Sequence, residues 1–542
     1  MDAMEPEPAT DLVTETAAES PETGRRPERT QEQGQSLSLP LPPPDKAVPL
    51  RPASKLLDLS RLPRGRGVRK LSKPVRRAAI ASVVAAAVAG GVLVALPRSG
   101  EEQKPAARPA AGAPGVASSL AALNARVRTN PLDHGAWSAL GGALVERGAR
   151  GADAAFYPKA EAALKRSLAV RPAARGNVAG MTAMAQLAHQ RGDFAATKRW
   201  GESVRMQSPG SWAAYPLLID AYGRLGDPKA AARTAEELME KRGGATALGW
   251  TAQTYRDKGW REDAAALTSQ AVALAGTPRE KADELLRAAE LAWERGDLSE
   301  SLGFYDSALA LDRRQGAAVA GRARVLAGLG RTPEAVKAYR TALALTPRPE
   351  YALELGELTE ADGGNGEPQY GVARAQVAYD SRQGVRGNLV LGRLEADHGD
   401  ADTAVELLRE EWSRRHGPEV ADALGWALHR AGDDEAALEY ARKATKAGVR
   451  SALFSYHRGE IERAVGDYGA ARRHLEEALR VNPVFSPLWA PRAQASLTRL
   501  GDPPEGGPAS MWPSRPVSPP AQGPAGRSQE PRTAEPSPRK KR

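Results

Sequence analysis

Residues 424–437, LGWALHRAGDDEAA, and residues 458–471, RGEIERAVGDYGAA, each place a Gly-Asp step between two stretches of helical character. A glycine recurs at the equivalent position along the chain, at Gly192, Gly226, Gly259, Gly296, Gly330, Gly399, Gly432 and Gly466. Successive glycines are 33 to 37 residues apart, except for one interval of 69 residues that contains a further turn at Asp362-Gly363-Gly364. A period of this length is typical of helical repeat arrays.

The residues around each glycine explain why the chain should turn there. Glycine adopts the left-handed conformation that ends a helix, and a following aspartate can cap the next helix. Five positions after the glycine a small residue recurs, at Thr197, Ala231, Ala264, Ser301, Ala335, Ala404, Ala437 and Ala471. Small side chains at this position allow the second helix to lie close to the first, so the sequence predicts consecutive helix hairpins.

This pattern resembles the tetratricopeptide repeat. The opening Trp-x2-Leu-Gly of that repeat is matched by Trp137, Leu140 and Gly141, and the Leu-Gly step returns at residues 355–356, 391–392 and 424–425. About ten units are expected, and the arrangement is similar to large actinobacterial tetratricopeptide proteins with one N-terminal transmembrane helix. The resemblance implies an all-α fold, a right-handed α-solenoid of helix hairpins.

The two ends of the chain are rich in Pro, Gly, Glu, Arg and Ser, whereas its middle is rich in Ala and Leu. Such ends are predicted to be disordered. The expected segments are a disordered cytoplasmic region (1–76), a transmembrane helix (77–97), a linker (98–115), the repeat array (116–483), a capping helix (484–500) and a disordered, Pro-rich basic tail (501–542).

The hydrophobic segment at residues 78–96 carries no charge. As a helix it would rise about 28 Å, close to the ~30 Å hydrocarbon core of a bilayer. Eight basic residues lie between Arg61 and Arg77, whereas the charges after Pro97 are mixed in sign. The positive-inside rule therefore predicts a single-pass protein of the cell membrane, with a cytoplasmic N-terminus and the repeats outside the cytoplasm. A cleaved signal peptide and an Ala-rich helix of the folded body are the alternatives.

No catalytic or cofactor-binding motif is recognisable. The chain contains no cysteine, which excludes disulfides and thiolate metal sites. It contains no phosphate loop, no Gly-x-Ser-x-Gly and no Gly-x-Gly-x-x-Gly motif, and its seven histidines lack metal-ligand spacing. We therefore expect no enzyme activity, no cofactor and no metal. The net charge of +10 is modest for this length, so no nucleic-acid partner is expected.

In tetratricopeptide proteins the first helix of each pair lines a concave groove. The resemblance therefore implies candidate partner-binding residues at Arg224, Gln253, Arg256, Glu290, Trp293, Arg324, Glu357, Arg393, Trp426, His429, Arg430, Tyr456 and Arg463. Arginine and aromatic side chains are frequent anchors of recognition. The same residues also fit the polar faces of solvated helices, which is the competing interpretation of each position.

The expected function is that of a membrane-anchored, non-catalytic scaffold that binds a protein or peptide in its concave groove. Two alternatives stay open. One is a soluble secreted binding protein released by signal cleavage. The other is a regulatory subunit of an envelope enzyme or transporter complex.

Overall fold

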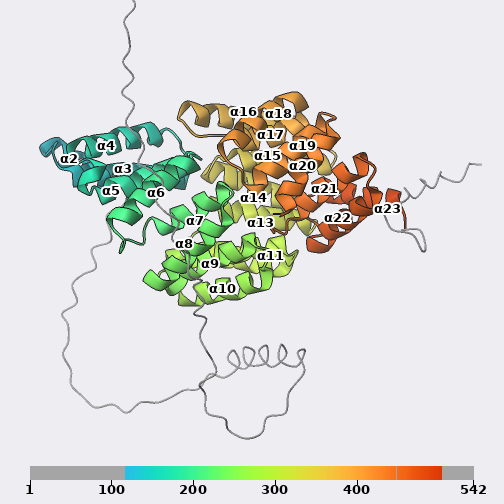
Figure 1. Cartoon of the computed structure of the whole chain (residues 1–542), viewed down its shortest axis with the longest axis horizontal. Coiled ribbons are helices and arrows are strands. Elements are labelled where there is room, and N and C mark those ends of the chain that lie inside the picture. Colours follow the sequence, from blue (N-terminus) through green and yellow to red (C-terminus); the bar gives the residue numbers. More distant parts are fainter. Residues whose placement is uncertain (1–115, 447, 503–542) are drawn as a thin grey trace, which may run out of the picture. The chain divides into compact units, whose positions relative to one another are not determined.

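Twenty-two α-helices and one short 3-10 turn follow one another in the computed structural model, which describes residues 116–446 and 448–502 (Figure 1). This part of the chain contains no strand, so the expectation of an all-α fold is confirmed for it. The regions expected at residues 1–76, 77–97 and 98–115 lie outside the described residues, as does residue 503 onward. Among the described helices, none is long and apolar enough to cross a membrane.

One helix, ten helix pairs and a last helix make up this array. The elements are α2 (Val116–Thr129), α3 (His134–Gly151), α4 (Phe156–Val170), η2 (Ala173–Arg175), α5 (Val178–Gln190), α6 (Phe194–Gln207), α7 (Tyr215–Arg224), α8 (Pro228–Lys241), α9 (Gly244–Asp257), α10 (Arg261–Leu274), α11 (Pro278–Glu294), α12 (Leu298–Leu311), α13 (Gly316–Gly328), α14 (Thr332–Leu345), α15 (Pro349–Ala361), α16 (Glu367–Arg382), α17 (Asn388–His398), α18 (Ala401–Arg414), α19 (Pro418–Arg430), α20 (Asp434–Lys446), α21 (Ala452–Ala464), α22 (Tyr468–Val481) and α23 (Trp489–Leu500). The pairs run from α3/α4 to α21/α22.

The turn between the two helices of a pair is built by glycine and aspartate. Gly226 has a φ of +83°, and the side chain of Asp227 accepts a hydrogen bond from the Ala230 amide at 2.9 Å. This cap satisfies one of the free amides at the start of α8. Gly399 differs from the expected left-handed geometry, since its φ is −158°, although Asp400 still caps α18. The Gly-Asp step therefore ends one helix and starts the next.

The glycine of the Leu-Gly step has a packing role within each pair. A Cβ atom at Gly141 would overlap the Leu164 side chain, and one at Gly392 would overlap the Leu408 side chain. Ala437, five residues after a turn glycine, has no exposed surface. Small residues thus lie on both helices of a pair, where the glycine of the first accepts a large side chain or the backbone of the second, which brings the two helices close together.

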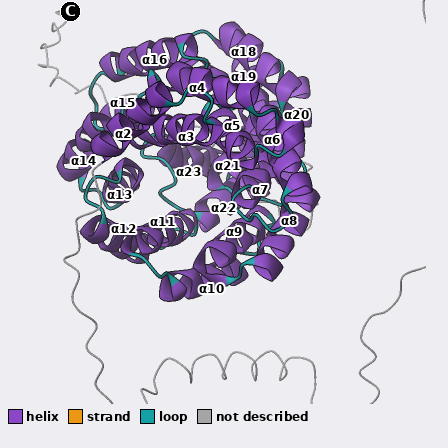
Figure 2. Cartoon of the chain, turned by 90° about the vertical axis from the view of Figure 1, so that its left-hand side faces the viewer, coloured by secondary structure: helices purple, strands orange, loops and turns teal. Residues whose placement is uncertain are grey.

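The array winds so tightly that pairs five or six units apart touch. The turn after α5 meets the loop before α17, where the Arg386 amide donates to the Arg191 carbonyl at 3.0 Å. The end of α11 meets the loop after α22, where the Asn482 side-chain amide donates to the Trp293 carbonyl at 2.8 Å, across 189 residues. Figure 2 shows the helix pairs winding around a common axis. The first helices of the pairs therefore face a space that a later part of the array also borders.

Candidate functional site

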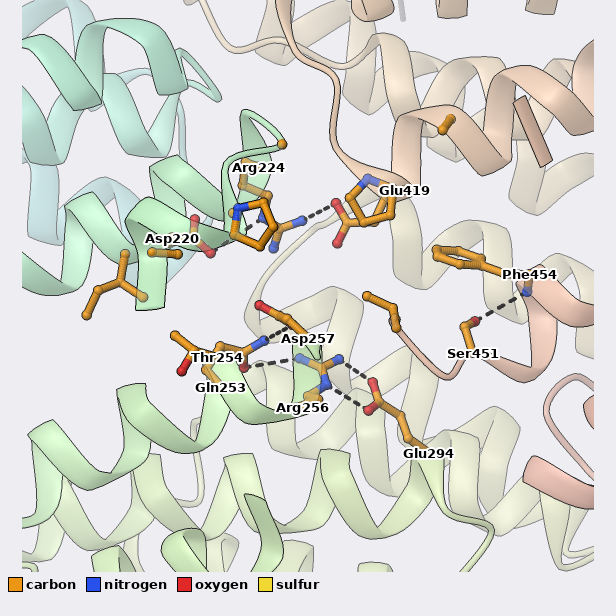
Figure 3. Close-up of a pocket in the computed structure, with 18 of the residues that line it drawn as sticks. Asp220, Arg224, Gln253, Thr254, Arg256, Asp257, Glu294, Glu419, Ser451 and Phe454 are labelled. Atoms are coloured by element: carbon orange, nitrogen blue, oxygen red, sulfur yellow. Dashed lines mark hydrogen bonds and ion pairs between the residues drawn. The ribbon is translucent and has the colours of Figure 1, made fainter. Parts of the chain in front are cut away.

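A cavity with a volume of about 680 Å³ lies between two parts of the array that are distant in sequence (Figure 3). One wall comes from α7, α8, α9, α11 and α13, and the other comes from α19, α20, α21 and the loops beside them. The lining combines apolar side chains such as Ile219, Trp293 and Phe454 with many ionic ones. A preformed concavity with a few fixed polar groups is the usual setting of a binding site.

Arg224, at the end of α7, connects the two walls. Its Nη1 lies 2.7 Å from Glu419 Oε2, which comes from α19, and its Nε lies 3.5 Å from Asp220 Oδ1. Burial alone would raise the pKa of Glu419, but the positive charges of Arg224 and Arg415 outweigh it and lower that pKa. The ion pair therefore fixes the charge of Glu419 and holds one winding of the array against the next.

Asp220 shows the same balance of burial and charge. Burial would raise its pKa, yet a hydrogen bond from His189 at 2.9 Å and the charge of Arg224 together lower the pKa to about 2. A carboxylate that is stabilised by two such partners stays ionised at neutral pH. Asp220 is therefore a fixed negative charge in the lining of the cavity.

Arg256 on α9 is held by a fork of hydrogen bonds. Its Nε donates to Glu294 Oε2 at 2.7 Å, and its Nη2 contacts the other oxygen of the same carboxylate. Its Nη1 donates to Gln253 Oε1 at 3.1 Å, while Gln253 Nε2 donates to Asp257 Oδ1 at 2.9 Å. Bidentate pairing of this type fixes the position of a guanidinium group as well as its charge. Figure 3 shows Asp257 between this pair and the Arg224–Glu419 pair.

Two carboxylates of the cavity have raised pKa values. Burial raises the pKa of Asp257 to about 6, against the opposing charge of Arg256 and with a further upward contribution from Glu419. Burial also raises the pKa of Glu290, although Arg256 opposes that shift. The surroundings of Asp257 and of Glu290 thus each disfavour the ionised form of the carboxyl group.

All thirteen residues expected in the groove lie on the first helix of a pair, but the structure does not gather them in one place. The ones that line the cavity are Arg224, Gln253, Arg256, Glu290, Trp293 and Arg324. The ones that do not line it are Glu357, Arg393, Trp426, His429, Arg430, Tyr456 and Arg463. The resemblance thus predicted that these residues lie on the first helices of the pairs, but it did not show which of them line the cavity.

The aromatic anchors at the C-terminal end differ from the expectation. Trp426 is 4 % exposed, stacks on His457 at a ring distance of 4.2 Å, and donates from Nε1 to Asp397 at 2.8 Å. Tyr456 is 3 % exposed. Trp489, from the last helix, packs against Trp426 and Tyr456 with ring distances of 6.1 Å each. The chain's own last helix therefore occupies the place that a partner would need.

Sequence reasoning missed several residues of the cavity. These are Asp257, Glu294 and Glu419 among the acids, Lys443 and Lys446 at α20, and Phe454 on α21. Asp257 directly follows Arg256 in the last turn of α9, so the helical pattern offered a weak signal for it. No sequence signal pointed to the cavity residues of α19 to α21, because they lie far from α7 and α9 in the chain and are brought beside them only by the winding of the array.

The comparisons with known proteins support the repeat. A family model described as tetratricopeptide repeat matches residues 286–352, 320–363 and 389–452. The chain therefore contains tetratricopeptide repeats, a helical fold typical of protein–protein interaction scaffolds. No curated protein is similar enough in sequence to be identified as a relative.

Three of the solved structures that match this chain illustrate the similarity. Yeast Tom70 is 15% identical, with 72% of this chain and 94% of that chain covered and a TM-score of 0.29. PilF of Pseudomonas aeruginosa is 16% identical, with 43% and 97% covered and a TM-score of 0.30. A human IFIT1 dimer with PPP-AAAA is 15% identical, with 61% and 78% covered and a TM-score of 0.39.

Proposed function

We propose that this array of tetratricopeptide repeats is a membrane-tethered, non-catalytic scaffold whose cavity binds a segment of a partner protein. The observation that carries the proposal is the cavity of about 680 Å³, with ionic side chains that are already fixed by partners on both walls. Side chains that are ordered before binding lose little entropy when a ligand arrives.

Filling the cavity tests this proposal directly. Gly223 on α7 lines the cavity, and a Cβ atom there would meet only Asp257 Oδ2, at 3.9 Å. The variant Gly223→Trp therefore has room for its first side-chain atom and would direct an indole ring toward the cavity. The control is Gly303→Trp on α12, where a Cβ atom meets nothing within 4 Å and the residue is exposed.

The measurement uses a random peptide library displayed on phage and selected on the full chain. We expect enriched peptides to bind the wild-type chain and Gly303→Trp equally, and to bind Gly223→Trp at least about tenfold more weakly, a loss of about 1.4 kcal/mol. Circular dichroism would verify that both variants keep their helix content. Absence of any enriched peptide, or equal binding by all three chains, would contradict the cavity as the binding site.

Membrane tethering is a separate part of the proposal. It is supported by the uncharged segment at residues 78–96 and by the basic residues that precede it, and the same bias supports a cytoplasmic N-terminus with the repeats outside. Protease added to intact cells that express the chain with a C-terminal tag should remove the tag and leave a short membrane-bound fragment. A tag that stays protected in the membrane fraction would place the repeats in the cytoplasm, and a tagged chain in the medium would indicate cleavage.

A further inference from the structure

Residues 482–489, Asn-Pro-Val-Phe-Ser-Pro-Leu-Trp, join α22 to α23 and lie against helices from much earlier in the chain. We call them the crossing segment. Their side chains contact five first helices, namely α11, α13, α15, α19 and α21, and the most distant of these contacts spans 189 residues. In Figure 1, α23 lies at the end of the array opposite α2, and Figure 2 shows it through the space inside the ring of helix pairs. Because the first helices face this space, the crossing segment lies in the groove.

The first half of the crossing segment is held beside Trp293 on α11. Asn482 is 2 % exposed, and its side-chain amide donates to the Trp293 carbonyl at 2.8 Å, while its side-chain oxygen accepts from the Val484 amide at 3.0 Å. Val484 packs beside Gly328 on α13, since a Cβ atom at Gly328 would lie 3.0 Å from Val484 Cγ2 and 3.2 Å from the Trp293 ring. Asn482 and Val484 thus have separate places on two first helices.

The second half of the crossing segment is held by aromatic side chains. The Phe485 ring lies 5.7 Å from the Tyr456 ring, and the Trp489 ring lies 6.1 Å from the rings of both Tyr456 and Trp426. Distances of this size allow favourable contacts between aromatic rings. Trp489 Nε1 also donates to Glu357 Oε1 at 3.4 Å. The segment is therefore bound through side chains at its first, third, fourth and eighth positions.

The role of α23 as a cap does not require these contacts. A terminal helix covers the face that the last pair of a repeat array would otherwise expose. On α22, Arg472 Nη2 donates to the Leu500 carbonyl at the end of α23 at 3.1 Å, and Ala493 of α23 has no exposed surface. The helices α11, α13 and α15 instead belong to the fifth, sixth and seventh of the ten pairs. The contacts of the crossing segment with them are additional to capping.

The crossing segment is attached to the array through its side chains and not through its backbone. In the part of the chain that the structure describes, the backbone of residues 483–488 makes no hydrogen bond to another segment of the array. The amides of Val484 and Leu488 donate to Asn482 and Ser486 within the segment itself. A separate peptide with the same side chains could therefore form the same contacts with the groove.

The place of Trp489 is an incomplete fit. Its 3.4 Å bond to Glu357 Oε1 is at the long limit of hydrogen bonds. His398 is 6 % exposed, and its Nε2 lies 3.8 Å from the same oxygen and has no hydrogen-bond partner among the described residues. A buried polar atom without a partner lowers stability. A ligand that also offered a hydrogen bond to His398 would thus fit this place better than the chain's own tryptophan.

We propose that the groove between Trp293 and Trp426 binds an extended segment of a partner protein, and that the crossing segment occupies this site until the partner displaces it. The partner segment carries an asparagine, an aliphatic residue two positions later, and aromatic residues three and seven positions later, as the crossing segment does. The inference goes beyond the proposed function, because none of residues 482–489 lines the cavity of about 680 Å³. Trp293 borders both places.

A reversible lock on the crossing segment tests the inference. The chain has no cysteine, and a Cβ atom at Gly328 would lie close enough to Val484 for a disulfide, so the double variant Gly328→Cys, Val484→Cys can be oxidised and reduced. The probe is a fluorescein-labelled peptide with the sequence of residues 481–491, and fluorescence anisotropy measures its binding. A tethered occupant competes as if it were present at about millimolar concentration. We expect the reduced chain to bind the peptide at least about tenfold more tightly than the oxidised chain.

Three controls accompany this comparison. The wild-type chain, treated with the same oxidant, should bind the peptide with unchanged affinity, because it has no cysteine. Trp489→Ala removes one anchor of the competing segment, so this chain should bind the peptide at least about tenfold more tightly than the wild-type chain. A peptide in which alanine replaces its tryptophan should bind none of the chains measurably. Circular dichroism would verify the helix content of each variant.

The outcomes also separate this inference from the proposed function. Equal affinity of the oxidised and reduced chains, or equal binding of the peptide with and without its tryptophan, would overturn the inference and leave the cavity as a binding site. Loss of peptide binding in Gly223→Trp would assign the peptide to the cavity and would also overturn it. A dimer of the reduced chain that oxidation abolishes, measured by size-exclusion chromatography, would identify the occupant as a second copy and overturn the assignment to a partner protein. Failure of the phage selection would contradict the proposed function without affecting this test.

Discussion

The cavity bordered by α7 to α13 and the aromatic cluster of α19, α21 and α23 occupy equivalent positions in the repeat but have opposite properties. In the cavity, charged side chains face an open volume, and one of them, Arg224, pairs with Glu419 from a later winding of the array. In the aromatic cluster, Trp489 covers Trp426 and Tyr456, and its Nε1 donates to Glu357 Oε1 at 3.4 Å. The comparison shows that the last helix closes one part of the groove and leaves another part open.

The largest expected effect comes from removal of the Trp489 ring, which covers the C-terminal part of the groove. Trp489 is 4 % exposed, so Trp489→Ala should lower the free energy of unfolding of the last repeats by about 3 to 5 kcal/mol. Trp212→Ala is the control, because Trp212 is 37% exposed, and it should cost about 1 kcal/mol or less. Urea unfolding followed by tryptophan fluorescence and circular dichroism measures both. Equal losses would mean that α23 does not seal the groove.

An intermediate effect is expected where two windings of the array touch. Gly259 has a φ of +77°, and a Cβ atom there would overlap the carbonyl oxygen of Gly448. Gly259→Ala should therefore cost about 2 to 4 kcal/mol, from backbone strain and the displaced contact together.

A matched variant separates the two causes. Gly432 has a φ of +87°, and a Cβ atom there would meet nothing within 4 Å, so Gly432→Ala should show the strain alone, about 1 to 2 kcal/mol. Thermal unfolding of the two variants gives the difference. If the two substitutions cost the same free energy of unfolding, the contact between the turn after α9 and the loop before α21 contributes nothing to stability.

The smallest effect concerns the two aspartates of the cavity and depends on pH. The folded-state pKa of Asp257, about 6, lies above its ordinary value of 3.8, so its contribution to stability is present below about pH 4 and is lost as the pH rises through 6. Asp257→Asn should therefore stabilise the protein by about 1 kcal/mol at pH 7.5, less than the full shift implies because the residue is partly exposed.

Asp220 should behave in the opposite way. Its pKa is lowered to about 2, so its contribution is present above about pH 4 and is lost as the pH falls toward 2. Asp220→Asn should destabilise the protein by about 1 kcal/mol at pH 7.5, and the difference from the wild-type chain should shrink in acid. Unfolding curves across this pH range measure both variants. The same sign for both would mean that burial, and not ion pairing, controls the two sites alike.

Much of the fold follows from local sequence. Each hairpin contains the residues that fold it. These are a glycine that accepts a positive φ, an aspartate that caps the next helix and a small residue five positions after the glycine. The Leu-Gly step adds the close contact between the helices of a pair, as between Gly141 and Leu164. These signals act over a few turns of helix, and for this reason the periodicity predicted the helix pairs.

The candidate site followed from sequence only in part. The resemblance placed Arg224, Arg256 and Glu290 on helices that face the axis, and these three do line the cavity. It also selected Trp426 and Tyr456, which are buried against Trp489. Identical repeat positions cannot show which of them the last helix covers, because that depends on where the helix folds back.

By itself, the sequence determined the repeat, the helix pairs and the inward-facing helices, since hydrophobic spacing and turn chemistry operate between residues that are near in the chain. Only the tertiary structure decided that Arg224 meets Glu419 across 195 residues and that one cavity is lined by residues from both of these distant parts of the chain. The physical reason is that each hairpin is rotated slightly relative to the one before it, and the sum of these small rotations from the third pair to the ninth sets which distant side chains meet.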